Sequence, residues 1–256
     1  MPFTLIHRLM ARLHGGAASV VPPLPRPDQP LCLIGDIHGR SDLLDLMLQR
    51  IAQQPGGEDA HIIALGDLID RGPDSAGVIS RLMDEQATRP AHVTVLMGNH
   101  ERLMLDFLAD PVRNPRWLHF GAADTMRSYG IEPATDRPAL AAEVLRNAMP
   151  QSHRDWLTNL PLYWEGDGLV AVHADADPSR PLSRQSEDVL LWGRDDFGRR
   201  RQNPPCWIAH GHVIQEQPYA LSGRIALDTG AWKTGTLSAA WLDADGLRFI
   251  QVGAPA

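Results

Sequence analysis

Apolar segments of strand length alternate with helical patterns along the first half of the chain, and this alternation constrains the fold more than any other feature. Strands are expected at Leu31–Ile34, His61–Leu65 and His92–Met97, and helices at 42–51, 74–86 and 101–109. Ser41 is placed to cap the first helix, whose apolar residues recur at helical spacing. Such strand–helix alternation predicts an α/β domain with a largely parallel sheet.

The second half of the chain changes character twice. Residues 110–160 have the pattern of several short helices interrupted by proline, which predicts a helical insertion. Further strands are expected at Leu169–His173, Trp207–His210, Arg224–Leu227, Leu237–Leu242 and Leu247–Val252. The turn at 243–246 predicts that the last two form a hairpin. We expect one domain over residues 31–256, preceded at 1–30 by an amphipathic segment and a proline-rich linker.

Each of the first three strands ends in a glycine that is followed at once by polar side chains. The sequences are GDIHG at 35–39, GDLIDRG at 66–72 and GNHE at 98–101. Two later strands end in a similar way, at His173 and at His210-Gly211-His212. Because ligands of open α/β sheets bind outside the carboxyl ends of the strands, these loops should converge on one place.

Six side chains from these loops would then form a set of oxygen and nitrogen ligands: Asp36, His38, Asp67, Asn99, His173 and His212. The set is too large for one tetrahedral ion and suits two ions of the Mn, Fe or Zn type bridged by a carboxylate. Taken singly, such an aspartate is more often a helix cap, and such a histidine a hydrogen-bonded core residue. Their coincidence at five strand ends favours the metal site.

The motifs GDIHG, GDLIDRG and GNHE, followed in the same order by VHA and by the GH of HGH, resemble those of the calcineurin-like metallophosphoesterases. More narrowly, they are similar to the PPP-type serine/threonine protein phosphatases and their bacterial and bacteriophage relatives. The resemblance extends to about Trp232, and its combination of motifs is highly specific. It implies a four-layer α/β/β/α sandwich with a dinuclear metal site where the two sheets meet.

The resemblance also implies roles for single residues. The metal ligands would be Asp36 and His38 on the first ion, Asp67 between both ions, and Asn99, His173 and His212 on the second. His100 resembles the general acid of the family, oriented by Asp70 through a carboxylate–imidazole pair. Arg71 and Arg194 resemble the arginines that hold the phosphate oxygens. Asp228 receives no role.

These roles imply a metal-dependent phosphomonoesterase that hydrolyses phosphoserine and phosphothreonine in proteins or peptides, by in-line attack of a metal-bridging hydroxide. The cofactor would be two divalent ions, Mn²⁺ by resemblance, with Zn²⁺ or Fe as alternatives because affinity rises along the metal series.

A symmetrical diadenosine-tetraphosphate hydrolase is the alternative, together with a broad-specificity phosphatase or phosphodiesterase, since the same core serves them all. Asp70 and Glu101 favour the protein phosphatases, because those hydrolases tend to lack the second aspartate and to end the third motif in aspartate. A binding module without catalytic activity would lack ligands or the acid, and none is missing.

Three residues depart from the family pattern or complicate it. Asp175 stands where the family often has glycine, and Val213 stands where relatives often have threonine. His210 lies two residues before His212, and both histidines of such a pair bind metal in many metallophosphoesterases outside the PPP branch. We assign the metal to His212 and place His210 beside it; the roles of His210 and Asp175 stay open.

Composition limits the partners and the location. A formal net charge of −7 with 6% aromatic residues argues against nucleic-acid binding. The sequence has no apolar run long enough to span a membrane; residues 1–14 are expected to form a short helix docked on the body, with weak contact to a membrane surface as the alternative.

Cys32 and Cys206 are expected as buried thiols, which favours the cytoplasm. Trp117 and the other tryptophans are expected in the core or in pocket walls, and Arg199–Arg201 on a solvated face.

Overall fold

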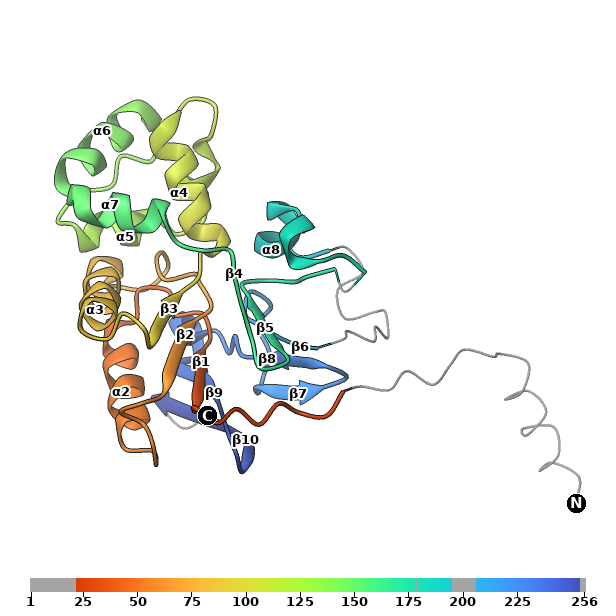
Figure 1. Ribbon diagram of the computed structural model, residues 1–256. Helices are drawn as coiled ribbons and strands as arrows, with labels where there is room; N and C mark the ends of the chain where they lie inside the picture. Colours follow the sequence, from red (N-terminus) through yellow and green to blue (C-terminus); the bar gives the residue numbers. More distant parts are fainter. Residues whose placement is uncertain (1–21, 178, 195–205, 254–256) are drawn as a thin grey trace, which may run out of the picture.

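The computed structural model describes residues 22–177, 179–194 and 206–253, and its centre consists of two packed β-sheets (Figure 1). The first sheet has the strand order β10-β9-β1-β2-β3. Its strands are β1 (Leu31–Ile34), β2 (His61–Ala64), β3 (Val93–Val95), β9 (Thr236–Asp243) and β10 (Gly246–Gly253). β1, β2 and β3 are parallel as predicted. The predicted hairpin β9–β10 is present and pairs antiparallel with β1, so the sheet is mixed rather than largely parallel.

The second sheet has the strand order β4-β5-β6-β8-β7. Its strands are β4 (Tyr163–Gly166), β5 (Leu169–Val172), β6 (Trp207–His210), β7 (Tyr219–Leu221) and β8 (Arg224–Ala226). β5, β6 and β8 are parallel and were predicted; β4 and β7 run antiparallel at the edges. The edge strands escaped prediction because YWEG and YAL are short, partly exposed and lack an apolar run.

Side chains that alternate along β1 show how the layers pack. Leu31 and Leu33 lie between the two sheets, where they belong to one core cluster with Leu169 of the second sheet. Cys32 and Ile34 point the other way and pack against helices. Each such buried leucine contributes about 1.5–3 kcal/mol, and a one-residue slip would reverse both faces of the strand. The predicted α/β sandwich is therefore confirmed.

Helices α2 (Ser41–Ala52) and α3 (Ser75–Thr88) cover the outer face of the first sheet (Figure 1). α3 begins after Asp74, whose side chain accepts the Gly77 N–H at 2.8 Å. The prediction that Ser41 caps α2 is wrong, because Ser41 is already the first helical residue. Its hydroxyl donates instead to Asp74 Oδ2 at 2.6 Å, which ties the starts of the two helices together.

A helical lobe lies beyond the carboxyl ends of β1, β2 and β3 (Figure 1). It contains α4 (Asn99–Ala109), the 3₁₀ helix η1 (Pro115–His119), α5 (Ala122–Ser128), α6 (Pro138–Ala148) and α7 (Gln151–Thr158). Phe107 and Trp117 are fully buried inside it, with their ring centres 5.2 Å apart. The lobe thus occupies the stretch predicted to be helical and places η1 and α5 near the loop at 66–72.

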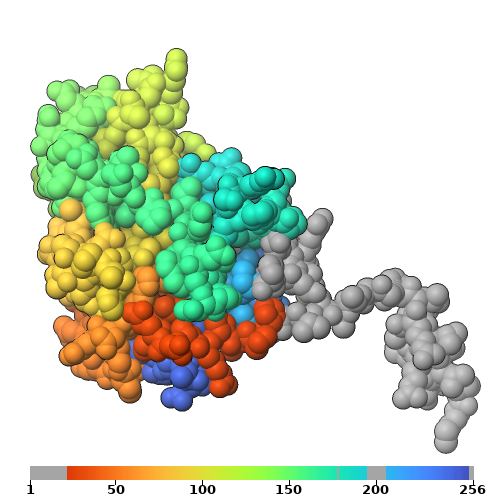
Figure 2. Space-filling model, in the orientation of Figure 1, coloured from red at the N-terminus to blue at the C-terminus, as the bar shows by residue number. Residues whose placement is uncertain are grey.

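A smaller layer covers part of the outer face of the second sheet. It consists of the 3₁₀ helix η2 (Leu182–Arg184) and α8 (Glu187–Trp192), and Leu190 packs there on Val170 and Ile208. The short helix α9 (Ala231–Thr234) follows β8. In the space-filling view, α8 and the helical lobe lie next to each other above the sheets (Figure 2).

Among the described residues, no helix is long and apolar enough to cross a membrane. Residues 1–14 and 199–201, for which a docked helix and a solvated face were expected, lie outside the described residues. Both cysteines are free. Cys32 is buried as predicted, and its burial raises the pKa of the thiol; Cys206 is only half-buried.

Candidate metal centre

Loops from both sheets meet at the carboxyl ends of the parallel strands. Two groups of side chains there have potential ligand atoms within 4.8 Å of one another: His38, Asp67 and His100 in the first, and Asp67, His173 and His212 in the second. Asp67 is common to both groups. A shared carboxylate between two sets of imidazoles is the geometry expected for a pair of bridged ions.

Asp67 lies at the middle of this arrangement and is almost fully buried. Its Oδ1 accepts the backbone N–H of His100 at 3.0 Å, at the start of α4, where the helix dipole favours negative charge. Its oxygens lie 3.5 Å from His38 Nε2 and 3.4 Å from His173 Nε2. Gly98 is required beside it, because a Cβ there would lie 2.3 Å from Asp67 Oδ1.

The imidazoles of two strand-end loops are oriented by backbone carbonyls. His38 Nδ1 donates to the Ile69 carbonyl at 2.7 Å, and His173 Nδ1 donates to the Leu65 carbonyl at 2.9 Å. Each Nε2 therefore keeps its lone pair and faces the centre, as in metal-binding histidines held by an outer hydrogen bond. Burial lowers the pKa of His38 to about 3, so its imidazole is neutral at neutral pH.

Asn99 connects the two later histidines. Its Oδ1 lies 2.8 Å from His173 Nε2 and 3.0 Å from His212 Nδ1. Burial lowers the pKa of His212 to about 4, so this ring is also neutral. An amide oxygen and imidazole nitrogens that converge in this way are suitable ligands for one divalent cation.

Asp36 lies beside this set, although it belongs to neither of the two groups. Its oxygens accept the backbone N–H of His212 at 3.1 and 3.0 Å. Gly211 permits this approach, since a Cβ there would lie 1.8 Å from Asp36 Oδ1. Burial and the charges of Asp228 and Asp67 raise the pKa of Asp36 well above its usual range. Burial also raises the pKa of Asp228 to about 6.

The donor set fits divalent cations. Asp36, Asp67 and Asp228 are buried carboxylates that repel one another when ionised, and the neutral histidines leave lone pairs directed at the same place. Arg71 adds one positive charge, and its Nη1 donates to His38 Nε2 at 3.0 Å. A cation at the first group would take the lone pair of Nε2 in place of this hydrogen bond. Divalent cations at the two groups would balance the remaining negative charge and use the lone pairs.

The backbone at the site is held in an unfavourable conformation. Seven described non-glycine residues have positive φ, and five of them were predicted as site residues: His38 (45°), Asp67 (49°), Asp70 (70°), Arg71 (68°) and His212 (64°). Each such residue costs about 1–3 kcal/mol, and strain of this kind persists where the surrounding structure fixes it, often at functional sites. The strain therefore supports the same set of residues as the motifs do.

The predicted pairing of Asp70 with His100 is present, and the helical lobe holds it in place. His100 Nδ1 lies 2.7 Å from Asp70 Oδ2. Trp117 of η1 donates its indole N–H to the same oxygen at 2.9 Å, and Thr125 of α5 donates its hydroxyl to Oδ1 at 2.6 Å. Burial alone would lower the pKa of His100, but the charge of Asp67 and the bond to Asp70 outweigh it and raise the pKa.

Sequence reasoning missed both of these contacts. It assigned Trp117 to the core or a pocket wall and did not single out Thr125. Their partner lies 47 and 55 residues earlier in the chain, so no local pattern could have revealed the hydrogen bonds.

Glu101, the last residue of GNHE, joins two of the loops. It is fully buried, and its carboxyl accepts the backbone N–H groups of Gly98, Asp67, Leu68 and Ile69 at 2.8, 2.9, 2.8 and 3.2 Å. Burial, followed by the charge of Asp67, raises its pKa to about 7. Glu101 therefore fixes the position of Asp67 from the start of α4.

Arg194 and the two open residues lie further from the ligand groups. Arg194 Nε donates to Asp175 Oδ2 at 2.8 Å, and Arg224 donates to the other oxygen at 2.9 Å. Asp175 thus anchors two arginines, and the phosphate contact expected of Arg194 stays a prediction. His210 is buried with its Nδ1 3.1 Å from the Gly211 carbonyl, and it belongs to neither ligand group, unlike His212.

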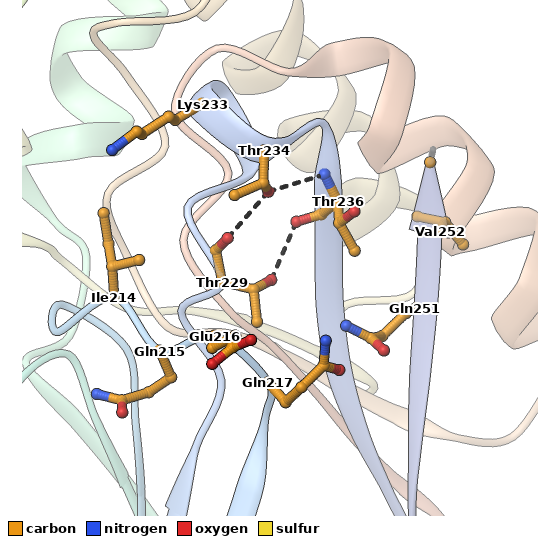
Figure 3. Close-up of a pocket in the computed structure, with 11 residues that line it drawn as sticks. Ile214, Gln215, Glu216, Gln217, Thr229, Lys233, Thr234, Thr236, Gln251 and Val252 are labelled. Atoms are coloured by element: carbon orange, nitrogen blue, oxygen red, sulfur yellow. Dashed lines mark hydrogen bonds between the residues drawn. The ribbon is translucent and has the colours of Figure 1, made fainter. Parts of the chain in front are cut away.

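A pocket that the sequence did not predict lies beside the turn that carries Asp228 (Figure 3). Its volume is about 590 Å³. Within it, Thr234 donates to the Thr229 carbonyl at 2.9 Å and Thr229 donates to the Thr236 carbonyl at 3.0 Å, as the dashed lines show. Gln215, on another wall, donates its N–H to the Asp228 carbonyl at 2.8 Å. One wall of the pocket is therefore hydrogen-bonded to the turn that carries Asp228, and the hydroxyls of Thr229 and Thr234 are already engaged within the fold.

Divalent cations are expected to stabilise the protein more at pH 7.5 than at pH 5.5. Because the folded-state pKa of Asp228 is raised to about 6, the unfolding free energy of the metal-free protein falls as pH rises from about 4 through about 6, and the raised pKa of Asp36 acts in the same direction. A bound cation balances the charges of the ionised carboxylates and so offsets this loss of stability. Saturating Mn²⁺ should raise Tm by about 5–10 °C at pH 7.5 relative to EDTA, and by less at pH 5.5. Thermal unfolding measures both shifts; equal shifts at the two pH values would contradict the role of the carboxyls.

Comparison with known proteins identifies related chains. The family profile described as calcineurin-like phosphoesterase matches residues 30–250. Serine/threonine-protein phosphatase 1 of Salmonella typhimurium is 29% identical over 214 residues, which cover 81% of this chain and 89% of the relative. The asymmetrical bis(5'-nucleosyl)-tetraphosphatase PrpE of Bacillus velezensis is 27% identical over 220 residues, which cover 77% and 83% of the two chains. A protein serine/threonine phosphatase structure from Saccharomyces cerevisiae matches with a TM-score of 0.62 at 16% identity, covering 90% of this chain and 81% of that one.

Proposed function

We propose, on the premise that this chain belongs to the calcineurin-like phosphoesterases, that it removes phosphate from phosphoserine and phosphothreonine in proteins or peptides. Membership of the family makes the chain a metal-dependent phosphatase of the dinuclear type. The relatives are named both for protein substrates and for dinucleoside tetraphosphates. The choice between these substrates therefore depends on the chemistry of the leaving group.

The observation that carries the proposal is the buried pair of His100 and Asp70, 2.7 Å apart. Serine and threonine leave phosphate as alkoxides, which are poor leaving groups and need a proton. Cleavage of a dinucleoside tetraphosphate instead breaks a bond between two phosphates, so its leaving group is a nucleoside phosphate, which departs without added protonation. Because His100 Nδ1 is held by Asp70, Nε2 is the atom that can give a proton, and it lies 3.9 Å from Asp67 Oδ2 at the centre. A positioned proton donor favours the alkyl phosphate.

When bound, two divalent cations, for which we propose Mn²⁺, would acidify a water and hold phosphate oxygens. Their ligands would be Asp36, His38, Asp67, Asn99, His173 and His212. Arg71 would present its planar guanidinium to the phosphate, and stacking on Trp232, 5.3 Å away, limits its motion. Arg194 would be the second phosphate contact. Water attacks in line with the leaving oxygen, and His100 protonates that oxygen.

A comparison of substrates tests the proposal. The protein is loaded with Mn²⁺ and assayed on a phosphoserine peptide, on diadenosine tetraphosphate and on a small aryl phosphate, with elemental analysis of the bound metal. We expect kcat/KM to be at least about tenfold higher for the peptide than for the dinucleotide. A preference for the dinucleotide would overturn the peptide substrate. Failure on all three substrates with Mn²⁺, Zn²⁺ and Fe²⁺ would overturn the enzymatic function.

Thr125→Val is expected to lower kcat for a phosphoserine peptide by about tenfold, because it leaves Asp70 Oδ1 without its 2.6 Å donor inside a buried network. Thr125→Ser keeps the hydroxyl and is the matched control, which should stay within about twofold of the wild type. Steady-state kinetics measure both, with Tm as a check on folding. If Thr125→Ser lowers kcat as much as Thr125→Val does, the effect comes from lost packing of the methyl group rather than from the hydrogen bond to Asp70.

A further inference from the structure

Arg116 of η1 lies between two aromatic rings that border the candidate metal centre. Its guanidinium carbon is 5.8 Å from the ring centre of Phe120 and 5.4 Å from that of Trp192. The Phe120 ring in turn meets His100 at 6.2 Å, and the Trp192 ring meets His212 at 6.1 Å. Because η1 belongs to the helical lobe and Trp192 is the last residue of α8, Arg116 connects the helical lobe to α8. This contact lies beside both ligand groups.

The backbone that carries Arg116 is fixed relative to the catalytic pair. The next residue, Trp117, is fully buried, and its indole N–H is bonded to Asp70. Asp70 in turn holds His100. Arg116 therefore extends from a fixed backbone position, and its side chain is exposed and accessible to a ligand.

The charge of Arg116 is not used within the described part of the chain. No described carboxylate lies within the 4.0 Å of an ion pair, whereas Arg194 and Arg224 share Asp175 at 2.8 and 2.9 Å. Contact with aromatic faces holds a guanidinium through its plane and leaves its N–H groups at the edge. Those N–H groups are suited to a carboxylate or a phosphate, which they bind in a planar, two-pronged manner.

We propose that Arg116 forms a subsite for a second anionic group of the substrate, beyond the phosphate that is cleaved. This inference rests on the proposed function and deepens it. Along an extended peptide, an acidic side chain two or three residues from the phosphoserine lies about 7–10 Å away. Arg116 is separated from His100 by the Phe120 ring, which contacts both residues, so its distance from the catalytic pair suits such a side chain. The favoured source of the anion is an acidic residue of a phosphopeptide; the polyphosphate chain of a dinucleotide offers the same chemistry.

Paired phosphopeptides test the subsite. Two peptides differ only in having glutamate or glutamine at the second and third positions after phosphoserine. The wild type should have a lower KM for the acidic peptide, and Arg116→Met, which keeps an apolar stem against the rings, should reduce this preference by about tenfold. Arg116→Lys should restore part of it. Arg113→Met is the matched control, because Arg113 is exposed three residues earlier and pairs with Asp110 at 3.6 Å; it should leave the preference unchanged.

The outcomes separate the subsite from the proposed function. If the wild type does not distinguish the two peptides, or if Arg116→Met raises both KM values equally, the subsite is wrong. A fall in Tm of Arg116→Met without a change in peptide preference would show that Arg116 only joins the helical lobe to α8, which also overturns it. If Arg116→Met instead raises KM for diadenosine tetraphosphate alone, the subsite stands and its source is the polyphosphate chain. A wild type that cleaves none of these substrates overturns the proposed function itself.

Discussion

Asp67→Asn is expected to lower kcat on a small aryl phosphate by at least about 10³-fold, the largest effect of any single substitution in this chain. Asp67 is the one side chain common to both ligand groups, so its charge bears on both cation positions. Asparagine keeps the size of the side chain but removes the negative charge and one acceptor oxygen. The bound metal should fall with the activity, because the remaining ligands are mostly neutral.

Kinetics and elemental analysis of the same preparation check this expectation. Asp84→Asn is the control, since Asp84 is an exposed residue of α3 that lies outside the ligand groups. It should retain wild-type activity and metal content. An Asp67→Asn protein with full metal content and full activity would contradict the assignment of Asp67 to the centre.

His100→Asn is expected to show the second-largest effect, and the effect should depend on the leaving group. For an alkyl phosphate, kcat should fall by about 10²–10⁴-fold, because the alkoxide then departs without its proton. For an aryl phosphate the fall should be much smaller, because a phenolate leaves with little help. Asparagine retains a polar side chain at this position of α4, so the backbone N–H bond to Asp67 at 3.0 Å is kept.

A series of phosphate esters with leaving groups of graded acidity measures this dependence in one variant, so each substrate serves as a control for the others. In a plot of log kcat against the pKa of the leaving group, the slope should be steeper for His100→Asn than for the wild type. Parallel lines, with equal loss on every ester, would mean that His100 acts as a ligand or a structural residue rather than as the proton donor. A role of His100 as a ligand would agree with its place in the first ligand group.

Local patterns predicted most of the fold. The strands β1, β2, β5 and β6 lie where apolar runs predicted them. A strand that is buried on both faces needs a continuous apolar stretch, and such a stretch is visible in the local sequence. Partly exposed elements such as β4, β7 and α8 carry no such pattern and were missed. Ser41 was misjudged for a related reason: its hydroxyl had two polar uses, and the nearby Asp74 decided between them.

The sequence by itself determined which polar side chains gather at one edge of the sheets, since motifs such as GDLIDRG and GNHE place them directly after buried parallel strands, whose carboxyl ends lie together. The tertiary structure decided the partners. Only folding brings Trp117 and Thr125 to Asp70, pairs Arg194 with Asp175 and sets Arg116 between Phe120 and Trp192. Contacts between residues far apart in the chain depend on how layers and loops pack, and no local periodicity records them.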